Sequence, residues 1–259
     1  MHAPPLLGSF APGGTALVIG AGGIGSALAD RLTASPRFDR VVVACRAPEI
    51  AAERMAAAGG SIRVDAVAVD VLDELSVRNL AGHLKDIGLP LRLIICATGI
   101  LHRGADLKPE RKLEDIAPEA LAQVFAVNAF GPMLIAKHLV PLLPRRDRSV
   151  FAAISARVGS IGDNRLGGWY AYRASKAALN QFMKCTAIEL KRRIPGAIVA
   201  ALHPGTVDTG LSEPFQAGVP ERKLFSPKYS AERLLDVIDR LDAEDSGGFF
   251  AWDGSRIPW

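Results

Sequence analysis

The chain has 259 residues, of which 49% are hydrophobic and 22% are charged, with a formal net charge of +4. This length and composition indicate a globular protein with a sizeable core, and the dispersed basic residues argue against a nucleic-acid partner. The apolar residues fall in runs that are too short to span a bilayer, so we expect no membrane partner.

The N-terminal segment and the cysteines set the expected cellular context. Residues 1–14 contain no Lys or Arg and no long apolar run, so we expect a loose tail and no secretory signal. Cys45, Cys96 and Cys185 lie far apart in apolar patterns without metal-ligand spacing. We therefore expect buried, reduced thiols, no metal site and a cytoplasmic location. The basic clusters at residues 145–148 and 191–193 are interpreted as solvated ends of elements.

The first predicted element is a buried strand over residues 15–19, followed directly by a glycine-rich turn and a helix over residues 26–32. Glycines let the backbone approach a pyrophosphate, and the start of the helix offers free N–H groups to it. The sequence therefore predicts dinucleotide binding by Gly20, Gly22, Gly23, Ile24 and Gly25. The alternative is a tight turn that needs glycine only for its backbone angles.

The second predicted strand, residues 40–44, is followed by Cys45 and Arg46. In dinucleotide-binding folds an acidic residue here binds the ribose 2′-hydroxyl of NAD, whereas an Arg accommodates the 2′-phosphate of NADP. Arg46 therefore favours NADP(H) over NAD(H). The alternative is an Arg that faces solvent from a loop.

Strands and helices continue to alternate along the rest of the chain. The further predicted strands cover residues 62–69, 91–96, 149–154, 197–202 and 248–252. The further predicted helices cover residues 47–58, 73–87, 119–143, 229–241 and a segment that contains Tyr172 and ends near Arg193. Asp73 is a candidate N-cap of its helix. This alternation predicts an α/β fold with a Rossmann-type, doubly wound parallel sheet in a single domain, residues 15–259. Residues 211–227 lack a period and are rich in turn residues, so we expect a mobile substrate loop near residues 203–228.

Tyr172 and Lys176 lie four residues apart at the start of the predicted helix, and therefore on one helix face. A nearby ammonium favours the phenolate form of a tyrosine and lowers its pKa. The pair is thus a candidate proton donor and acceptor. The alternative is a packed ring beside a solvated charge.

In this order and on these elements, the motifs resemble the short-chain dehydrogenase/reductase family, in the branch that includes the C-factor and sniffer-type carbonyl reductases. The resemblance covers nearly the whole chain from residue 15. It includes the glycine turn and the Tyr172-x-x-x-Lys176 motif, and further Asp70-Val71, Ala97-Thr98-Gly99, Asn128, Pro204-Gly205, the segment ARVGSI at 156–161 and the terminal FFAWDGSRIPW.

The resemblance implies a homodimeric or homotetrameric enzyme that interconverts a small-molecule carbonyl and a secondary alcohol by hydride transfer with NADP(H). Tyr172 would act as general acid and base, Lys176 would hold the nicotinamide ribose and lower the pKa of Tyr172, and Asn128 would anchor a water. Asp70 would meet the adenine, and further cofactor contacts would come from Val71, Ala97, Thr98, Gly99, Pro204, Gly205, Thr206, Val207 and Thr209. The alternative for Asn128 is a side chain satisfied by backbone, and the alternative for Asp70 is a helix N-cap. His203 is expected to pack or to hydrogen-bond locally rather than to react.

The sequence departs from the family pattern at two places. Gly20 and Gly23 enclose two residues where the family usually has three, which puts the phosphate path in doubt. Ala156 stands where the family's catalytic Ser is expected. The nearby Ser155 or Ser160 would have to replace it, and Ser155 is our candidate for that role. These departures motivate a second hypothesis, an NADP(H)-binding regulatory or signalling protein with little or no catalysis.

Overall fold

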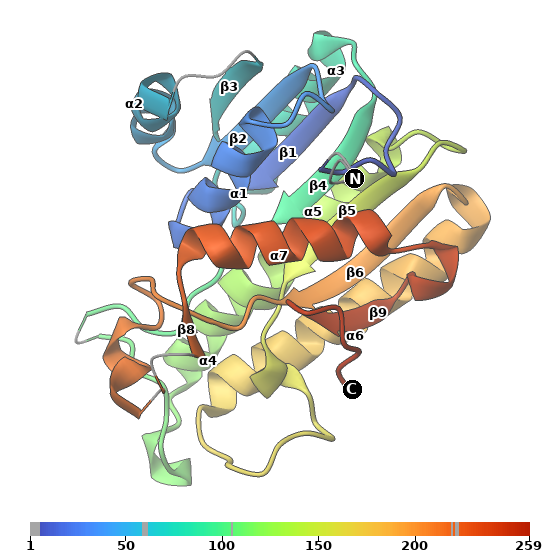
Figure 1. Cartoon of the computed structure of the whole chain (residues 1–259). Coiled ribbons are helices and arrows are strands. Elements are labelled where there is room, and N and C mark those ends of the chain that lie inside the picture. Colours follow the sequence, from blue (N-terminus) through green and yellow to red (C-terminus); the bar gives the residue numbers. More distant parts are fainter. Residues whose placement is uncertain (1–5, 59–61, 105, 219, 221–222) are drawn as a thin grey trace.

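A parallel sheet of seven strands forms the middle of the computed structural model, which describes residues 6–58, 62–104, 106–218, 220 and 223–259 (Figure 1). In the described chain the strand order is β3-β2-β1-β4-β5-β6-β9. The strands are β1 Thr15–Ile19, β2 Arg40–Cys45, β3 Arg63–Ala68, β4 Leu91–Cys96, β5 Ser149–Ile154, β6 Ala197–His203 and β9 Gly248–Ala251. The order reverses between β1 and β4, the place where ligands bind to open α/β sheets. The predicted fold class is confirmed.

Helices cover both faces of the sheet (Figure 1). One face carries α1 Gly23–Thr33, α2 Pro48–Ala58 and α7 Pro227–Arg240, and the other carries α3 Glu74–Ile87, α5 Gly131–Leu139 and α6 Tyr170–Arg193. A hydrophobic core lies on each face of the sheet. Successive residues of a strand point into these two cores alternately, because side chains alternate along a strand. Leu17 packs on the α3 side, for example, whereas Val18 packs on the α1 side.

The predicted helix over residues 119–143 is interrupted in the structure. It consists of α4 Pro118–Phe125, a π-helical segment Ala126–Phe130, α5, and a final 3₁₀ turn. An α-helical ladder would need an N–H at residue 132 for the carbonyl of Asn128, and Pro132 has none. The π segment thus changes the local hydrogen-bond pattern at Asn128, and such segments recur at functional sites.

The helical stretch Pro118–Leu142 is also long and apolar enough to cross a membrane by length and composition alone, which corrects the expectation that no such segment exists. Buried helices of ordinary protein cores satisfy the same criterion. Here α5 packs against α3, and the π segment packs against α6. The stretch therefore packs against other helices of this fold.

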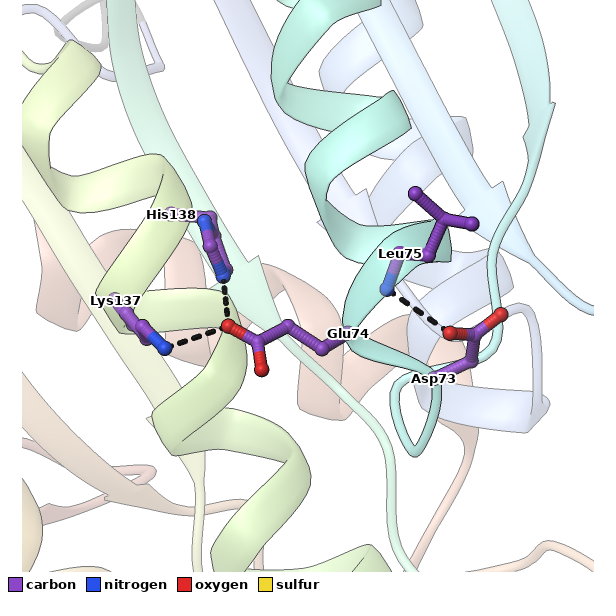
Figure 2. A network of polar contacts seen from close by, with 5 residues as sticks. All are labelled: Asp73, Glu74, Leu75, Lys137 and His138. Atoms are coloured by element: carbon purple, nitrogen blue, oxygen red, sulfur yellow. Dashed lines mark hydrogen bonds and ion pairs between the residues drawn. The ribbon is translucent and has the colours of Figure 1, made fainter.

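Figure 2 shows how α3 and α5 are tied together at the surface. Asp73 caps α3 by accepting a hydrogen bond from the N–H of Leu75, as expected for that residue. The next residue, Glu74, accepts hydrogen bonds from Lys137 at 2.6 Å and from His138 at 2.8 Å. These two partners hold the pKa of the Glu74 carboxyl below its usual value.

Three expectations about exposure are wrong. Within the presumed tail, Leu7 and Phe10 are buried in the core on the α1 side. Arg148, assigned to a solvated cluster, donates from its guanidinium to the carbonyl oxygens of Leu241 and Ile238 at the end of α7. Cys185 is exposed, because its position on α6 faces away from the sheet, whereas Cys45 and Cys96 are buried.

Candidate active site

A cavity of about 530 Å³ lies at the carboxyl ends of β1, β4, β5 and β6. Its lining combines the glycine turn, the end of β4, the loop after β5, the start of α6 and the segment after β6. The predicted residues that line it are Gly22, Gly23, Ile24, Gly25, Ala97, Thr98, Gly99, Ser155, Tyr172, Lys176, Pro204, Gly205, Thr206, Val207 and Thr209. The fold thus gathers fifteen of the predicted site residues around one space.

The glycine turn is tight enough to demand glycine at both of its ends. Gly20 has a φ of +99°, a conformation that side-chain-bearing residues rarely adopt. A Cβ at Gly25 would lie 1.9 Å from the carbonyl oxygen of Gly20. Because α1 begins at Gly23, its first N–H groups lack helical partners at the edge of the cavity. The turn therefore needs glycine for its backbone and also presents a helix start to a ligand.

Four predicted cofactor contacts do not line this cavity: Gly20, Arg46, Asp70 and Val71. Arg46 is exposed just after β2. Asp70 accepts a hydrogen bond from the N–H of Leu72, and Asp73 rather than Asp70 caps α3. Val71 packs in the core on the α3 side. Their roles toward a cofactor stay predictions.

Tyr172 and Lys176 both line the cavity from the first turns of α6 and are largely buried. The Lys176 ammonium donates to the carbonyl oxygen of Ile154 at 2.8 Å and lies 5.8 Å from the centre of the Tyr172 ring. Burial raises the pKa of Tyr172 above its usual value and lowers the pKa of Lys176 to about 8. The loss of hydration at the phenol sets the direction of the Tyr172 pKa in this structure, and the expected lowering of that pKa by Lys176 stays a prediction.

Asn128 is fully buried and ties the end of β4 to α6. Its side chain accepts from the N–H of Ile100 at 2.8 Å and donates to the Ile100 carbonyl at 2.9 Å. It also donates to the Ser175 hydroxyl at 3.1 Å. A side chain satisfied in this way fits the backbone-bound alternative, and it does not line the cavity. Its effect on the site is to fix the strand end beside α6.

The hydroxyl expected to assist Tyr172 is directed elsewhere. Ser155 is buried, and its hydroxyl donates to the side-chain oxygen of Asn180 at 2.7 Å. Ser160 is also buried, and its hydroxyl accepts from the N–H of Asp163. Ala156 lines the cavity at the position of the expected Ser. The catalytic assignment of Ser155 stays a prediction, and its present hydrogen bond weighs against it.

His203 lines the cavity at the end of β6. If its role were only to bond locally, its Nδ1 atom would have a hydrogen-bond partner nearby. That nitrogen is buried without a partner among the described residues. Burial, together with a smaller effect of the nearby Arg157, lowers the pKa of His203 to about 4. The imidazole is therefore neutral near neutral pH.

Sequence reasoning missed two residues that shape this site, Trp169 and Arg157. Both line the cavity together with Phe215. Phe215 lies in the predicted substrate loop, where its apolar character was the available signal. Trp169 directly precedes α6, yet its position beside Tyr172 depends on contacts with a distant loop that no local pattern reveals.

Comparison with known proteins identifies the family. The family model described as short chain dehydrogenase matches residues 14–219. The chain belongs to the short-chain dehydrogenase family. It is 30% identical over 246 residues to the 1-hydroxy-2-glutathionyl-2-methyl-3-butene dehydrogenase of Rhodococcus sp. strain AD45, covering 95% of this chain and 99% of that one. It is therefore a member of an oxidoreductase family, as the sequence predicts.

One further relative agrees with the predicted branch, and one solved structure shares the fold. The C-signal of Myxococcus xanthus is 37% identical over 147 residues, or 57% of this chain and 83% of that one. The NADPH-bound carbonyl reductase from chicken fatty liver has the same fold, with a TM-score of 0.82 at 24% identity, covering 97% of this chain and 96% of that one.

Proposed function

We propose that this protein is an NADP(H)-dependent oxidoreductase that interconverts a carbonyl compound and a secondary alcohol. The observation that carries the proposal is the placement of Tyr172 and Lys176 in one cavity with the glycine turn. The NADPH bound to the chicken carbonyl reductase supports the choice of cofactor. We further propose a cytoplasmic homo-oligomer.

The residues around the cavity fit a dinucleotide. Gly22 and Gly23 line it at the start of α1, and a Cβ on Gly23 would lie 2.4 Å from the Thr209 methyl group. A side chain at Gly23 would thus fill the space between the turn and the segment after β6. The bound cofactor would supply the hydride. Arg46, exposed after β2, would bind the 2′-phosphate.

The proton would be handled by this chain's own residues. Because burial keeps Tyr172 protonated, its hydroxyl is ready to donate to a carbonyl oxygen as that oxygen gains negative charge. The Lys176 ammonium lies on the same helix face and would hold the ribose hydroxyls of the cofactor. Its charge would stabilise the phenolate left after proton transfer.

A titration with the two reduced cofactors tests the cofactor assignment. We expect tight binding of NADPH, followed by cofactor fluorescence, and weaker binding of NADH. Arg46→Ala should weaken NADPH binding and leave NADH binding unchanged, because only NADPH carries the 2′-phosphate. Equal affinities in the unaltered protein would remove Arg46 as the selector, and the absence of binding to either cofactor would end the enzyme assignment.

A second candidate function is an NADP(H)-binding regulatory or signalling protein with little catalysis. The observations that favour it are Ala156 at the expected Ser position and the engagement of the Ser155 hydroxyl by Asn180. The similarity to the C-signal is in keeping with it. This candidate predicts NADPH binding without turnover, so turnover that depends on Tyr172 would exclude it.

A further inference from the structure

Trp169 has a backbone conformation that is unusual for a residue with a large side chain. Its φ is +52° and its ψ is +45°, in the left-handed region. The two residues before it, Gly167 and Gly168, are left-handed as well, where glycine tolerates the conformation readily. A bulky residue is kept in this region only when its surroundings impose it, and such residues gather at functional sites.

The surroundings that impose it come from Glu110, about sixty residues earlier in the chain. The N–H of Trp169 donates to the Glu110 carbonyl oxygen at 2.6 Å. The Glu110 carboxylate, which is only 3% exposed, accepts from the N–H of Ala171 at 3.1 Å in the first turn of α6. Arg173 ties the preceding residues by donating to the carbonyl oxygens of Gly167 and Gly168. The backbone is therefore held by hydrogen bonds both before and after Trp169.

The fixed indole forms part of the cavity wall beside the proposed proton donor. Its ring centre lies 6.3 Å from that of Tyr172 and 4.8 Å from that of Phe215, both in edge-to-face geometry. All three rings line the cavity, together with the apolar side chains of Leu101 and Leu211. A carbonyl placed at the Tyr172 hydroxyl would bring its attached group against this wall.

The charges around the cavity limit what that group can be. The described lining contains no Asp or Glu, so it offers no carboxylate to pair with a cationic group. Of the two cationic side chains in the described lining, Lys176 is bound to the Ile154 carbonyl and Arg157 pairs with Asp163 at 3.2 Å. A flat, uncharged group can instead pack against the rings of Trp169 and Phe215.

We propose that Trp169 is the specificity-determining residue of this site and selects carbonyl compounds that carry a flat apolar group next to the carbonyl. Glu110 is its positioning residue. This inference rests on the proposed oxidoreductase function and names the substrate class of the same cavity.

The test compares matched substrates in the full-length protein with NADPH: acetophenone against 2-butanone, and benzaldehyde against butanal. We expect the unaltered protein to favour the aryl member of each pair. Trp169→Gly should lower the aryl-to-alkyl ratio of kcat/KM at least tenfold, whereas Trp169→Phe should keep it within about threefold, since it retains a flat ring. Trp259→Gly, the same change outside the cavity, should leave the ratio unchanged.

Thermal unfolding separates this role from a merely structural one. Glycine adopts the left-handed conformation without strain, so Trp169→Gly should lose selectivity while keeping its melting temperature within a few degrees. Should that variant fail to fold, Trp169→Leu measures the same ratio with a non-planar side chain. An unchanged ratio in a folded variant would overturn the inference.

The outcomes also separate this inference from the proposed function. Reduction of the alkyl compounds without an aryl preference would overturn the role of Trp169 and leave the oxidoreductase function standing. NADPH binding without reduction of any of the four compounds would contradict both.

Discussion

Burial governs the protonation of the two side chains at the centre of the site. Tyr172 is kept protonated, and the Lys176 pKa falls to about 8 because its ammonium is removed from water. The spacing of the two residues predicted that they share a helix face. It did not predict the direction of the tyrosine pKa, because that direction depends on the depth of the cavity rather than on the distance along the helix.

The lowered Lys176 pKa predicts how cofactor affinity changes with pH. A bound cofactor would favour the ammonium, and the free protein loses that proton above about pH 8. The dissociation constant for NADPH should therefore rise by up to tenfold per pH unit above about pH 8. Fluorescence titrations from neutral to alkaline pH measure it. Lys176→Met should bind weakly at every pH and lack the step, whereas a flat profile in the unaltered protein would refute this role.

The alanine at position 156 leads to the prediction that a serine there would raise kcat. A hydroxyl at this cavity-lining position could donate to the carbonyl oxygen of a substrate beside Tyr172. Since removal of one such donor costs enzymes about 10²–10³ in kcat, Ala156→Ser should raise kcat by about tenfold or more. NADPH affinity should stay the same. Ala156→Gly serves as the control, and an equal kcat in Ala156→Ser would show that the missing hydroxyl does not limit the reaction.

At the scale of elements, local patterns predicted what local interactions determine. The apolar runs predicted the strands correctly, and Asp73 predicted the start of α3. The contacts between distant segments were beyond such patterns. Glu110 lies in an irregular loop yet supplies the hydrogen-bond acceptor at the start of α6, and Arg148 looked like part of a charged surface cluster. Their partners lie far along the chain, so nothing in the neighbouring residues indicates them.

The Arg148 contacts predict a stability difference within one basic cluster. Its guanidinium is half-buried, bonds to the carbonyls that end α7 and lies 5.0 Å from the centre of the Phe10 ring. Arg148→Ala should lower the free energy of unfolding by about 2 kcal/mol, since charge-assisted bonds contribute about 1.5–3 kcal/mol each before solvent screening. Arg146 is exposed in the same cluster, so Arg146→Ala should change it by less than about 0.5 kcal/mol. If denaturant unfolding showed an equal loss of unfolding free energy in the two variants, the structural role of Arg148 would be contradicted.

At the scale of the whole molecule, the sheet and its two helical layers leave apolar side chains on the outer surface of α6 and of the π segment before α5. Phe130 is 49% exposed and Ile188 is 58% exposed. We propose that this surface joins copies of the chain into a homodimer or homotetramer, as the family resemblance implies. The sequence indicated apolar helices here, but the side of each helix that stays uncovered follows only from how it packs on the sheet.

Light scattering during size-exclusion chromatography tests the assembly. We expect a mass of two or four chains for the unaltered protein and a smaller mass for Ile188→Lys, because a charge would be buried at the interface. Ile50, 68% exposed on α2 at the other face of the sheet, provides the control substitution Ile50→Lys. A monomeric unaltered protein would refute the proposed assembly.

The most direct test of the proposed reaction is the oxidation of NADPH, followed by its absorbance, with carbonyl substrates and with Tyr172→Phe as the comparison. We predict turnover by the unaltered protein and a loss of about 10²–10⁴-fold in the variant, with NADPH affinity preserved, because only the transferable proton is removed. Turnover that persists in Tyr172→Phe would contradict the role of Tyr172. Tight NADPH binding without turnover in the unaltered protein would favour the regulatory function instead.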